Sequence, residues 1–134
     1  MLHDLSARGQ LARLRDGSLS PVELAAHYLE RIARRDAELG AFVEVTADAA
    51  LARADALATT APAGALWGLP SADKDLVARA GVATRYGSAV RADHVPTSSD
   101  ELALLLDDAG AVSLGKTNTP EFGLTGYTES AVAP

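Results

Sequence analysis

The sequence predicts an α/β fold in which helices come first and the start of a sheet follows. Three observations predict it. Apolar residues recur at helical spacing through most of the first sixty residues. Two short extended segments follow, at residues 71–77 and 111–115, and an amphipathic segment lies between them. A strand, a crossover helix and a second strand are the pattern of a parallel α/β sheet.

The first and third helical segments are defined by leucine and alanine. Leucines at helical spacing predict a short helix over residues 5–14, with Asp4 as its N-cap and Gly17 as its stop. Residues 46–58 are almost all Ala, Leu, Arg and Asp. The narrow alanine face of this segment suits close packing against a larger neighbour.

The second helical segment has the clearest start signal in the chain. Ser20 at the N-cap, Pro21 at the first helical position and Glu23 at the third form a capping box with the preferred placement of proline. The apolar stripe continues from there towards Gly40, which should end the helix. Residues 1–60 are therefore expected to form an N-terminal helical layer.

Residues 64–134 are expected to begin the α/β core. A strand is predicted near residues 71–77, a turn and loop near 81–88, and a second strand at 111–115. Ser98 stands three residues before Glu101 and predicts a capping box at the start of the intervening helix. Its expected core-facing stripe consists of Leu102, Leu105, Leu106 and Ala109.

Composition excludes several classes of function. The chain has 134 residues and a formal net charge of -6, which argues against binding to a nucleic-acid backbone. It lacks an apolar run of about 20 residues, so no membrane span is expected. It has no cysteine, so a disulfide scaffold and thiolate metal sites are excluded. The N-terminus shows no secretory signal, and a cytoplasmic setting is the default.

The two lysines stand out against this composition. Of the 12 basic residues only Lys74 and Lys116 are lysines, and 28 of the 134 residues are alanine. A genome biased towards Arg and Ala explains most of this. Under such a bias a retained lysine indicates a position that needs an amine, because Arg cannot lose its proton in a protein whereas Lys can.

Lys74 lies between two acids, Asp73 and Asp75. Alternation along a strand would send Lys74 to one face and both acids to the other. A surface ion-pair cluster is the simpler interpretation. Nearby carboxylates raise the pKa of a lysine, which opposes a role as a base, whereas burial lowers it. The sequence leaves this choice open.

Several motifs in this order resemble the amidase signature family over nearly the whole chain. The similar segments are Ser20-Pro21-Val22-Glu23-Leu24, Leu66-Trp67-Gly68-Leu69-Pro70, Lys74-Asp75, Gly81-Val82-Ala83-Thr84, Gly87-Ser88, Leu102-Ala103-Leu104-Leu105, Gly110-Ala111-Val112, Leu114-Gly115-Lys116-Thr117-Asn118, Pro120-Glu121-Phe122 and Thr128-Glu129. The resemblance implies the first strands and the crossover helix of that family's mixed sheet.

The resemblance also implies a Ser–cis-Ser–Lys triad that hydrolyses amides without a metal or organic cofactor. Lys74 would be the triad lysine, and it should be at least partly buried beside a cavity. The serines would come from a Gly-Gly-Ser-Ser-Gly-Gly-Ser segment expected just beyond Pro134, so the chain is expected to be truncated and inactive alone. Gly123, Leu124 and Thr125 would line the substrate pocket, unless their glycines merely turn the chain. One departure is Asp73, because the family usually has an apolar residue there.

Other candidates for chemistry are weaker. The spacing around Gly110 and Lys116 matches a phosphate-binding loop, but a helix followed by a strand is the wrong context. The pair Ser98-Ser99 precedes acidic residues at a helix start, so capping explains it. The three histidines, His3, His27 and His94, are expected to be isolated and to have surface or packing roles.

The leading hypothesis is an amidase acting on a small-molecule amide substrate, with neither nucleic acid nor membrane as a partner. A non-catalytic module that binds a partner, and the front half of a glutamine-dependent amidotransferase subunit, are the alternatives. Uncovered apolar faces and strand edges would favour self-association, so a homo-oligomer is a further expectation.

Overall fold

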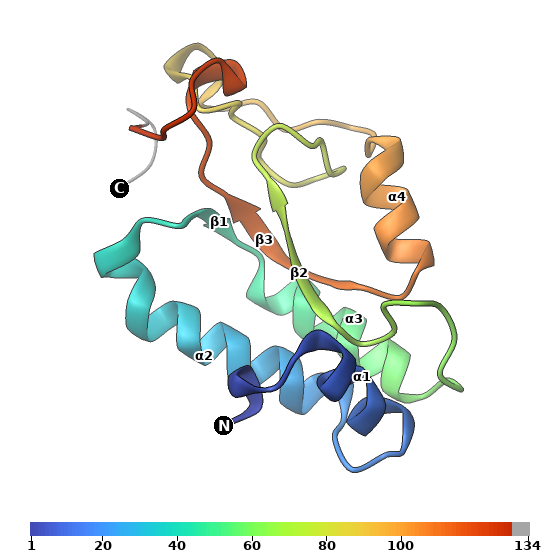
Figure 1. The fold of residues 1–134 in the computed structure, drawn as a ribbon. Helices are drawn as coiled ribbons and strands as arrows, with labels where there is room; N and C mark the ends of the chain where they lie inside the picture. The colour runs from blue at the N-terminus through green and yellow to red at the C-terminus, as the bar shows by residue number, and fades with distance from the viewer. Residues whose placement is uncertain (130–134) are drawn as a thin grey trace.

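The structure is a computed structural model that describes residues 1–129, and it confirms the α/β class (Figure 1). The α-helices are α1 (Ala7–Arg15), α2 (Pro21–Leu39), α3 (Ala47–Ala58) and α4 (Glu101–Asp108). The strands are β1 (Phe42–Val45), β2 (Pro70–Lys74) and β3 (Val112–Thr117). Short 3-10 helices are η1 (Leu2–Asp4), η2 (Ala89–Arg91) and η3 (Glu121–Gly123). None of the helices in residues 1–129 is long and apolar enough to cross a membrane.

The three strands form one mixed sheet in the order β1-β3-β2. The central strand β3 runs parallel to β2, as the sequence predicted, and antiparallel to β1, which makes the sheet mixed as the family resemblance implied. Gly115 lies where β1 crosses closely, and a Cβ at this position would collide with the carbonyl oxygen of Glu44. The register pairs Lys74 with Thr117, so β2 and β3 end side by side.

The helix starts follow local capping chemistry, with one correction. In α2 the amide of Glu23 donates to the Ser20 hydroxyl at 3.1 Å, and the Ser20 amide donates to the Glu23 carboxylate at 2.8 Å. These hydrogen bonds lower the pKa of Glu23. The prediction of Asp4 as the first N-cap is wrong. Ser6 caps α1, because its hydroxyl accepts from the Gly9 amide, and Asp4 lies in η1.

Strand β1 was not predicted, since the first sixty residues read as helices throughout. It has only four residues, too few to show a period against the flanking helices. The Asp36 carboxylate accepts hydrogen bonds from the amides of Ala41 and Phe42 as the chain leaves α2. Pairing with β3 then fixes the strand, a constraint that comes from residues about seventy positions later.

The core lies between the sheet and the helices α1 to α3. Its buried members include Leu14, Leu24, Ala25, Ala50, Ala54, Leu57, Trp67, Leu69, Val112 and Leu114. The small side chains of α3 face α2 and β3, which confirms the predicted close packing of its alanine face. In Figure 1, α4 lies on the other side of the strands from α2.

Helix α4 differs from its prediction in two respects, the residue that begins it and the apolar residues that it buries. Asp100, not Ser98, is the N-cap residue, and its carboxylate accepts from the Ala78 amide instead of capping the helix. Leu102 and Leu105 are 53% and 59% exposed. The helix instead buries Ala103 against the described residues, which turns the predicted leucine face outwards.

Leu24 offers a test of this core. Its side chain is fully buried, so Leu24→Ala should lower the free energy of unfolding by about 2–5 kcal/mol. Urea denaturation followed by the near-UV signal of Trp67 measures the change. Leu39→Ala, at a position 68% exposed in the same helix, should change it by less than about 0.5 kcal/mol. Equal effects of the two substitutions would contradict the assignment of the core.

Candidate active site at the carboxyl edge of the sheet

Lys74 is the last residue of β2, at the edge where β3 also ends. Its side chain is exposed, so the prediction that it is at least partly buried is wrong. Both neighbouring acids point to the covered side of the strand, and alternation therefore directs Lys74 outwards. Within residues 1–129 its ammonium has no ion pair with a carboxylate.

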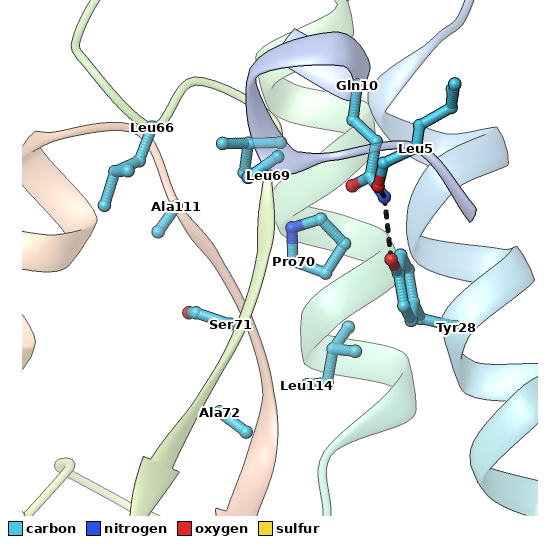
Figure 2. A pocket seen from close by; sticks show the side chains of 11 residues that line it. Leu5, Gln10, Tyr28, Leu66, Leu69, Pro70, Ser71, Ala72, Ala111 and Leu114 are labelled. Carbon is cyan, nitrogen blue, oxygen red and sulfur yellow. Dashed lines mark hydrogen bonds between the residues drawn. The ribbon is translucent and has the colours of Figure 1, made fainter. Parts of the chain in front are cut away.

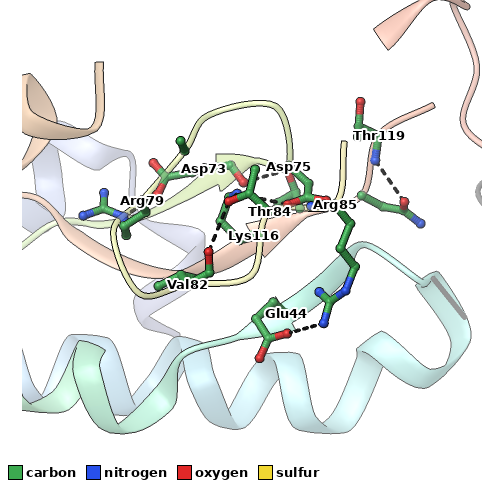
Figure 3. Close-up of polar contacts among 12 residues, drawn as sticks. Glu44, Asp73, Asp75, Arg79, Val82, Thr84, Arg85, Lys116 and Thr119 are labelled. Atoms are coloured by element: carbon green, nitrogen blue, oxygen red, sulfur yellow. Dashed lines mark hydrogen bonds and ion pairs between the residues drawn. The ribbon is translucent and has the colours of Figure 1, made fainter. Parts of the chain in front are cut away.

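Asp73 is buried and has its own cation. Its carboxylate accepts from Arg79 Nε at 2.7 Å (Figure 3). The same carboxylate accepts from the Ser113 hydroxyl at 3.1 Å. Arg79 also binds Asp107 of α4 at 2.7 Å. Burial opposes the charge on Arg79, but the hydrogen bonds and charges of the two carboxylates raise its pKa above the ordinary value. The unusual acid before Lys74 thus joins β2 to α4.

Asp75 is also buried, and its cation is Lys116. The Lys116 ammonium is completely buried in β3, 3.0 Å from the Asp75 carboxylate and 2.9 Å from the Thr84 hydroxyl (Figure 3). Thr84 in turn donates to the carbonyl of Val82 at 3.2 Å. Because a buried charge is costly without a partner, this pair must stay intact for the loop after β2 to keep its path.

Asp75 also fixes the backbone around Lys74. Its amide donates to the Thr117 carbonyl at 2.9 Å, and its carbonyl accepts from the Tyr86 amide at 3.1 Å. Its second carboxylate oxygen accepts from the Arg85 amide at 3.0 Å. The residue that follows Lys74 is therefore bound to the end of β3 and to the loop at 84–86.

The loops after β2 and β3 contact each other at this edge. The Phe122 amide donates to the Tyr86 carbonyl at 2.7 Å, and the Ser88 hydroxyl donates to Glu121 at 2.6 Å. Tyr86 and Phe122 both have a positive φ, 56° and 49°, which non-glycine residues rarely adopt. Such strained residues gather at functional sites, where the surrounding structure holds them in place.

The other predicted site residues lie beside this contact. Gly123 follows Phe122 and abuts Leu76, where a Cβ would come within 2.8 Å of a Leu76 methyl group. Leu124 and Thr125 line a cavity of about 290 Å³, which Pro120, Glu121, Tyr127 and Glu129 also line. Lys74 is not among the residues that line it. The structure thus groups Leu124 with Thr125, while Gly123 is the one that contacts the loop after Lys74.

A larger cavity of about 450 Å³ lies at the amino end of β2, away from Lys74 (Figure 2). It is lined mostly by apolar side chains from β2, β3 and the N-terminal helices. Gln10 and Tyr28 form its polar end, where the Gln10 amide donates to the Tyr28 hydroxyl at 2.7 Å. Its lining offers no charged group for acid–base chemistry.

The other residues considered for chemistry have structural contacts. Lys116 lies inside a strand that no long helix follows within the described residues, so the phosphate-loop alternative fails. The Ser99 hydroxyl accepts from the Ala80 amide rather than capping a helix. His3 and His27 are not isolated, because their ring nitrogens lie 2.9 Å apart. Over residues 1–129, no group of three or more His, Asp or Glu side chains is arranged to hold a metal ion.

Comparison with known proteins decides the family. The family model named Amidase matches residues 23–134. The chain belongs to the amidase signature family. A bacterial aryl acylamidase described as a member of the amidase signature enzymes is 29% identical, with a TM-score of 0.84 over 93% of this chain and 27% of that one. The peptide amidase from Stenotrophomonas maltophilia is 34% identical, with a TM-score of 0.83 over 89% of this chain and 26% of that one.

Curated relatives include a glutamyl-tRNA(Gln) amidotransferase subunit from each of two bacteria. The protein from Desulforapulum autotrophicum is 41% identical over 133 residues, which is 97% of this chain and 27% of the relative. That from Azoarcus sp. is 45% identical over 116 residues, 84% of this chain and 24% of the relative. The chain therefore spans about a quarter of the length of the curated relatives it matches.

The buried pair of Lys116 and Asp75 makes a stability prediction. Lys116→Met should lower the free energy of unfolding by about 3–5 kcal/mol, because it leaves the Asp75 charge buried and uncompensated. The double variant Asp75→Asn/Lys116→Met should recover much of this loss, since neither charge remains.

Urea denaturation measures both variants. Arg34→Met, which breaks the exposed pair with Glu30, serves as the control and should cost less than about 1 kcal/mol. A Lys116→Met effect as small as that of Arg34→Met would show that the ion pair does not organise this edge.

Proposed function

We propose that Lys74 is the acid–base lysine of an amidase-type hydrolase that cleaves the C–N bond of linear carboxamides with a Ser–cis-Ser–Lys triad. One observation carries the proposal: Lys74 ends β2 at the edge where the loops after two parallel strands meet, and within residues 1–129 its ammonium pairs with no carboxylate. In open α/β sheets, ligands bind outside the carboxyl ends of the strands. Membership of the amidase family supports the type of reaction.

In the proposed reaction, the Lys74 amine accepts the proton of a cis-serine hydroxyl. That hydroxyl accepts the proton of the nucleophilic serine as it attacks the amide carbonyl. The C–N bond then breaks, the ammonia or amine leaves with the proton, and water hydrolyses the acyl-serine. The 134 residues contain no Gly-Gly-Ser-Ser-Gly-Gly-Ser segment, so the proposal takes both serines from sequence outside them.

The proposed substrate contacts are Gly123, Leu124 and Thr125. Two of them line the cavity of about 290 Å³, and the third packs on the loop that follows Lys74. Backbone groups of this loop would orient the carboxamide beside the lysine. In this proposal the small-molecule substrate binds against the loop after β3, at the edge where Lys74 ends β2.

A second candidate is the front of a glutamine-dependent amidotransferase subunit. The names of the curated relatives favour it, at 41% and 45% identity. The acid–base role of Lys74 would be the same in both cases. The two candidates differ in the amide that is cleaved and in the fate of the ammonia.

A chimera tests the role of Lys74. Residues 1–129 would replace the matching quarter of Stenotrophomonas maltophilia peptide amidase, and ammonia release from a peptide amide would be measured. The chimera should be active, and Lys74→Ala should reduce kcat by at least about 10³-fold, as for other residues of a catalytic triad. Arg13→Ala, an exposed cation on α1, should leave the rate unchanged.

The same exchange into the amidotransferase subunit of Azoarcus sp., assayed with glutamine in its complex, separates the two candidates. The 134-residue chain alone should release no ammonia from either substrate. Turnover by the isolated chain, or an active chimera that tolerates Lys74→Ala, would refute the proposed role.

The exposed leucines of α4 predict self-association of the isolated chain. Leu102, Leu104 and Leu105 are each more than half exposed, and Leu102 and Leu105, three residues apart, lie on the same face of the helix. Light scattering after size exclusion should show oligomers that Leu102→Glu/Leu105→Glu reduces. A monomer that the double substitution does not change would contradict self-association through this face.

A further inference from the structure

Lys74 is flanked in sequence by two acids but paired with neither. Both carboxylates are buried, with side chains 1% exposed, whereas Lys74 is exposed. Each acid has a cation from another part of the chain. Arg79 holds Asp73 at 2.7 Å and Lys116 holds Asp75 at 3.0 Å.

These two cations bind the acids on the covered side of β2, the side to which strand alternation directs them. A buried carboxylate without a partner pays a large desolvation cost. Without its cation, an acid at the end of an edge strand would relax towards solvent, and Lys74 would then be the nearest sequence neighbour of opposite charge. A lysine held in such an ion pair is neutral less often at a given pH, since the carboxylate stabilises its charged form, and less of it is available as a base.

We propose that Arg79 and Lys116 are positioning residues for Lys74: each binds one of the acids beside it on the covered side of β2, and together they leave the Lys74 amine free to act on a hydroxyl. This inference rests on the proposed function, because a free amine matters only if Lys74 acts as the acid–base residue. The arrangement of charges around Lys74 can be tested by the reactivity of the lysine itself, without an enzymatic assay.

Other charged side chains of this polar network have partners of their own within the described residues. Arg79 also binds Asp107 of α4, and Arg85 binds Glu44 of β1 at 3.0 Å. Arg85 meets Asp75 only through its backbone amide, so Lys116 supplies the side-chain cation for that acid. Glu121 of η3 accepts from Ser88. Removing Lys116 therefore leaves Asp75 without its cation, and removing Arg79 leaves both Asp73 and Asp107 without theirs, of which only Asp73 is next to Lys74.

Chemical labelling reads this out, because the chain has only two lysines. Trace acylation with an N-hydroxysuccinimide acetate, quantified by mass spectrometry across pH, gives the rate at Lys74. In the unaltered chain Lys116 should be protected, since its side chain is fully buried. Protection of Lys116 and the near-UV signal of Trp67 report that the fold is intact.

Arg79→Gln should slow the acylation of Lys74 roughly threefold at a fixed pH below the midpoint of the profile, and move that midpoint up by about half a unit. This is the size expected for one carboxylate at about 6 Å in a dielectric close to that of water. Lys116→Met should shift the profile in the same direction. Asp73→Asn/Arg79→Gln, which removes the released charge, should restore the original profile.

Glu44→Gln is the matched control, because it breaks a partly buried ion pair without freeing an acid beside Lys74. It should leave the profile unchanged. If Lys116→Met does not fold, Arg79→Gln still tests the proposal, since it leaves the buried pair of Lys116 and Asp75 in place.

A merely structural role gives a different result. In that case, Arg79→Gln would expose Lys116 to the reagent without moving the midpoint of the Lys74 profile. The double variant Asp73→Asn/Arg79→Gln would then not restore the protection of Lys116. Either result overturns the proposal. An inactive chimera with the expected labelling shifts would instead reject the proposed function and leave the positioning role standing.

Discussion

The buried ion pair between Lys116 and Asp75 is the interaction on which the candidate site depends. It joins the central strand β3 to the first residue after β2, in a place where neither charge reaches solvent. Two bare charges could not remain there, so the pair and its bond to Thr84 fix the loop after β2. The contact of this loop with η3 follows from that path.

The central position of β3 explains why the site forms where it does. The strand pairs with β1 on one side and β2 on the other, and it contributes Ser113 and Lys116 to the two acids beside Lys74. One strand thus orders both the sheet and the polar network at its edge. The strained backbones of Tyr86 and Phe122 lie where the two loops meet, supported by the hydrogen bond between them.

The amidase signature family gives this arrangement a chemical context. The chain matches about a quarter of the length of its relatives, and that quarter includes a lysine whose two neighbouring acids are both paired with other cations. This pairing matters because a lysine between two acids would ordinarily form an ion pair with one of them. Here the acids are paired with Arg79 and Lys116, and the exposed Lys74 ends β2 at the edge where β3 also ends.

The sequence by itself determined the α/β class, the capping box of α2, the parallel pair of β2 and β3, and the alternation that separates Lys74 from its neighbouring acids. These features depend on local spacing and on side chains within a few residues of each other. It also singled out Lys116 by rarity alone, because only two lysines occur among 12 basic residues.

Only the tertiary structure decided the rest. Strand β1 exists because β3 pairs with it, and Asp100 is engaged by the Ala78 amide rather than by its own helix. Which face of α4 is buried depends on its neighbours, not on its leucines. The partners of Asp73 and Asp75 lie between 6 and 41 residues away along the chain, a range that local pattern does not encode, since charge pairing is decided by proximity in the folded chain.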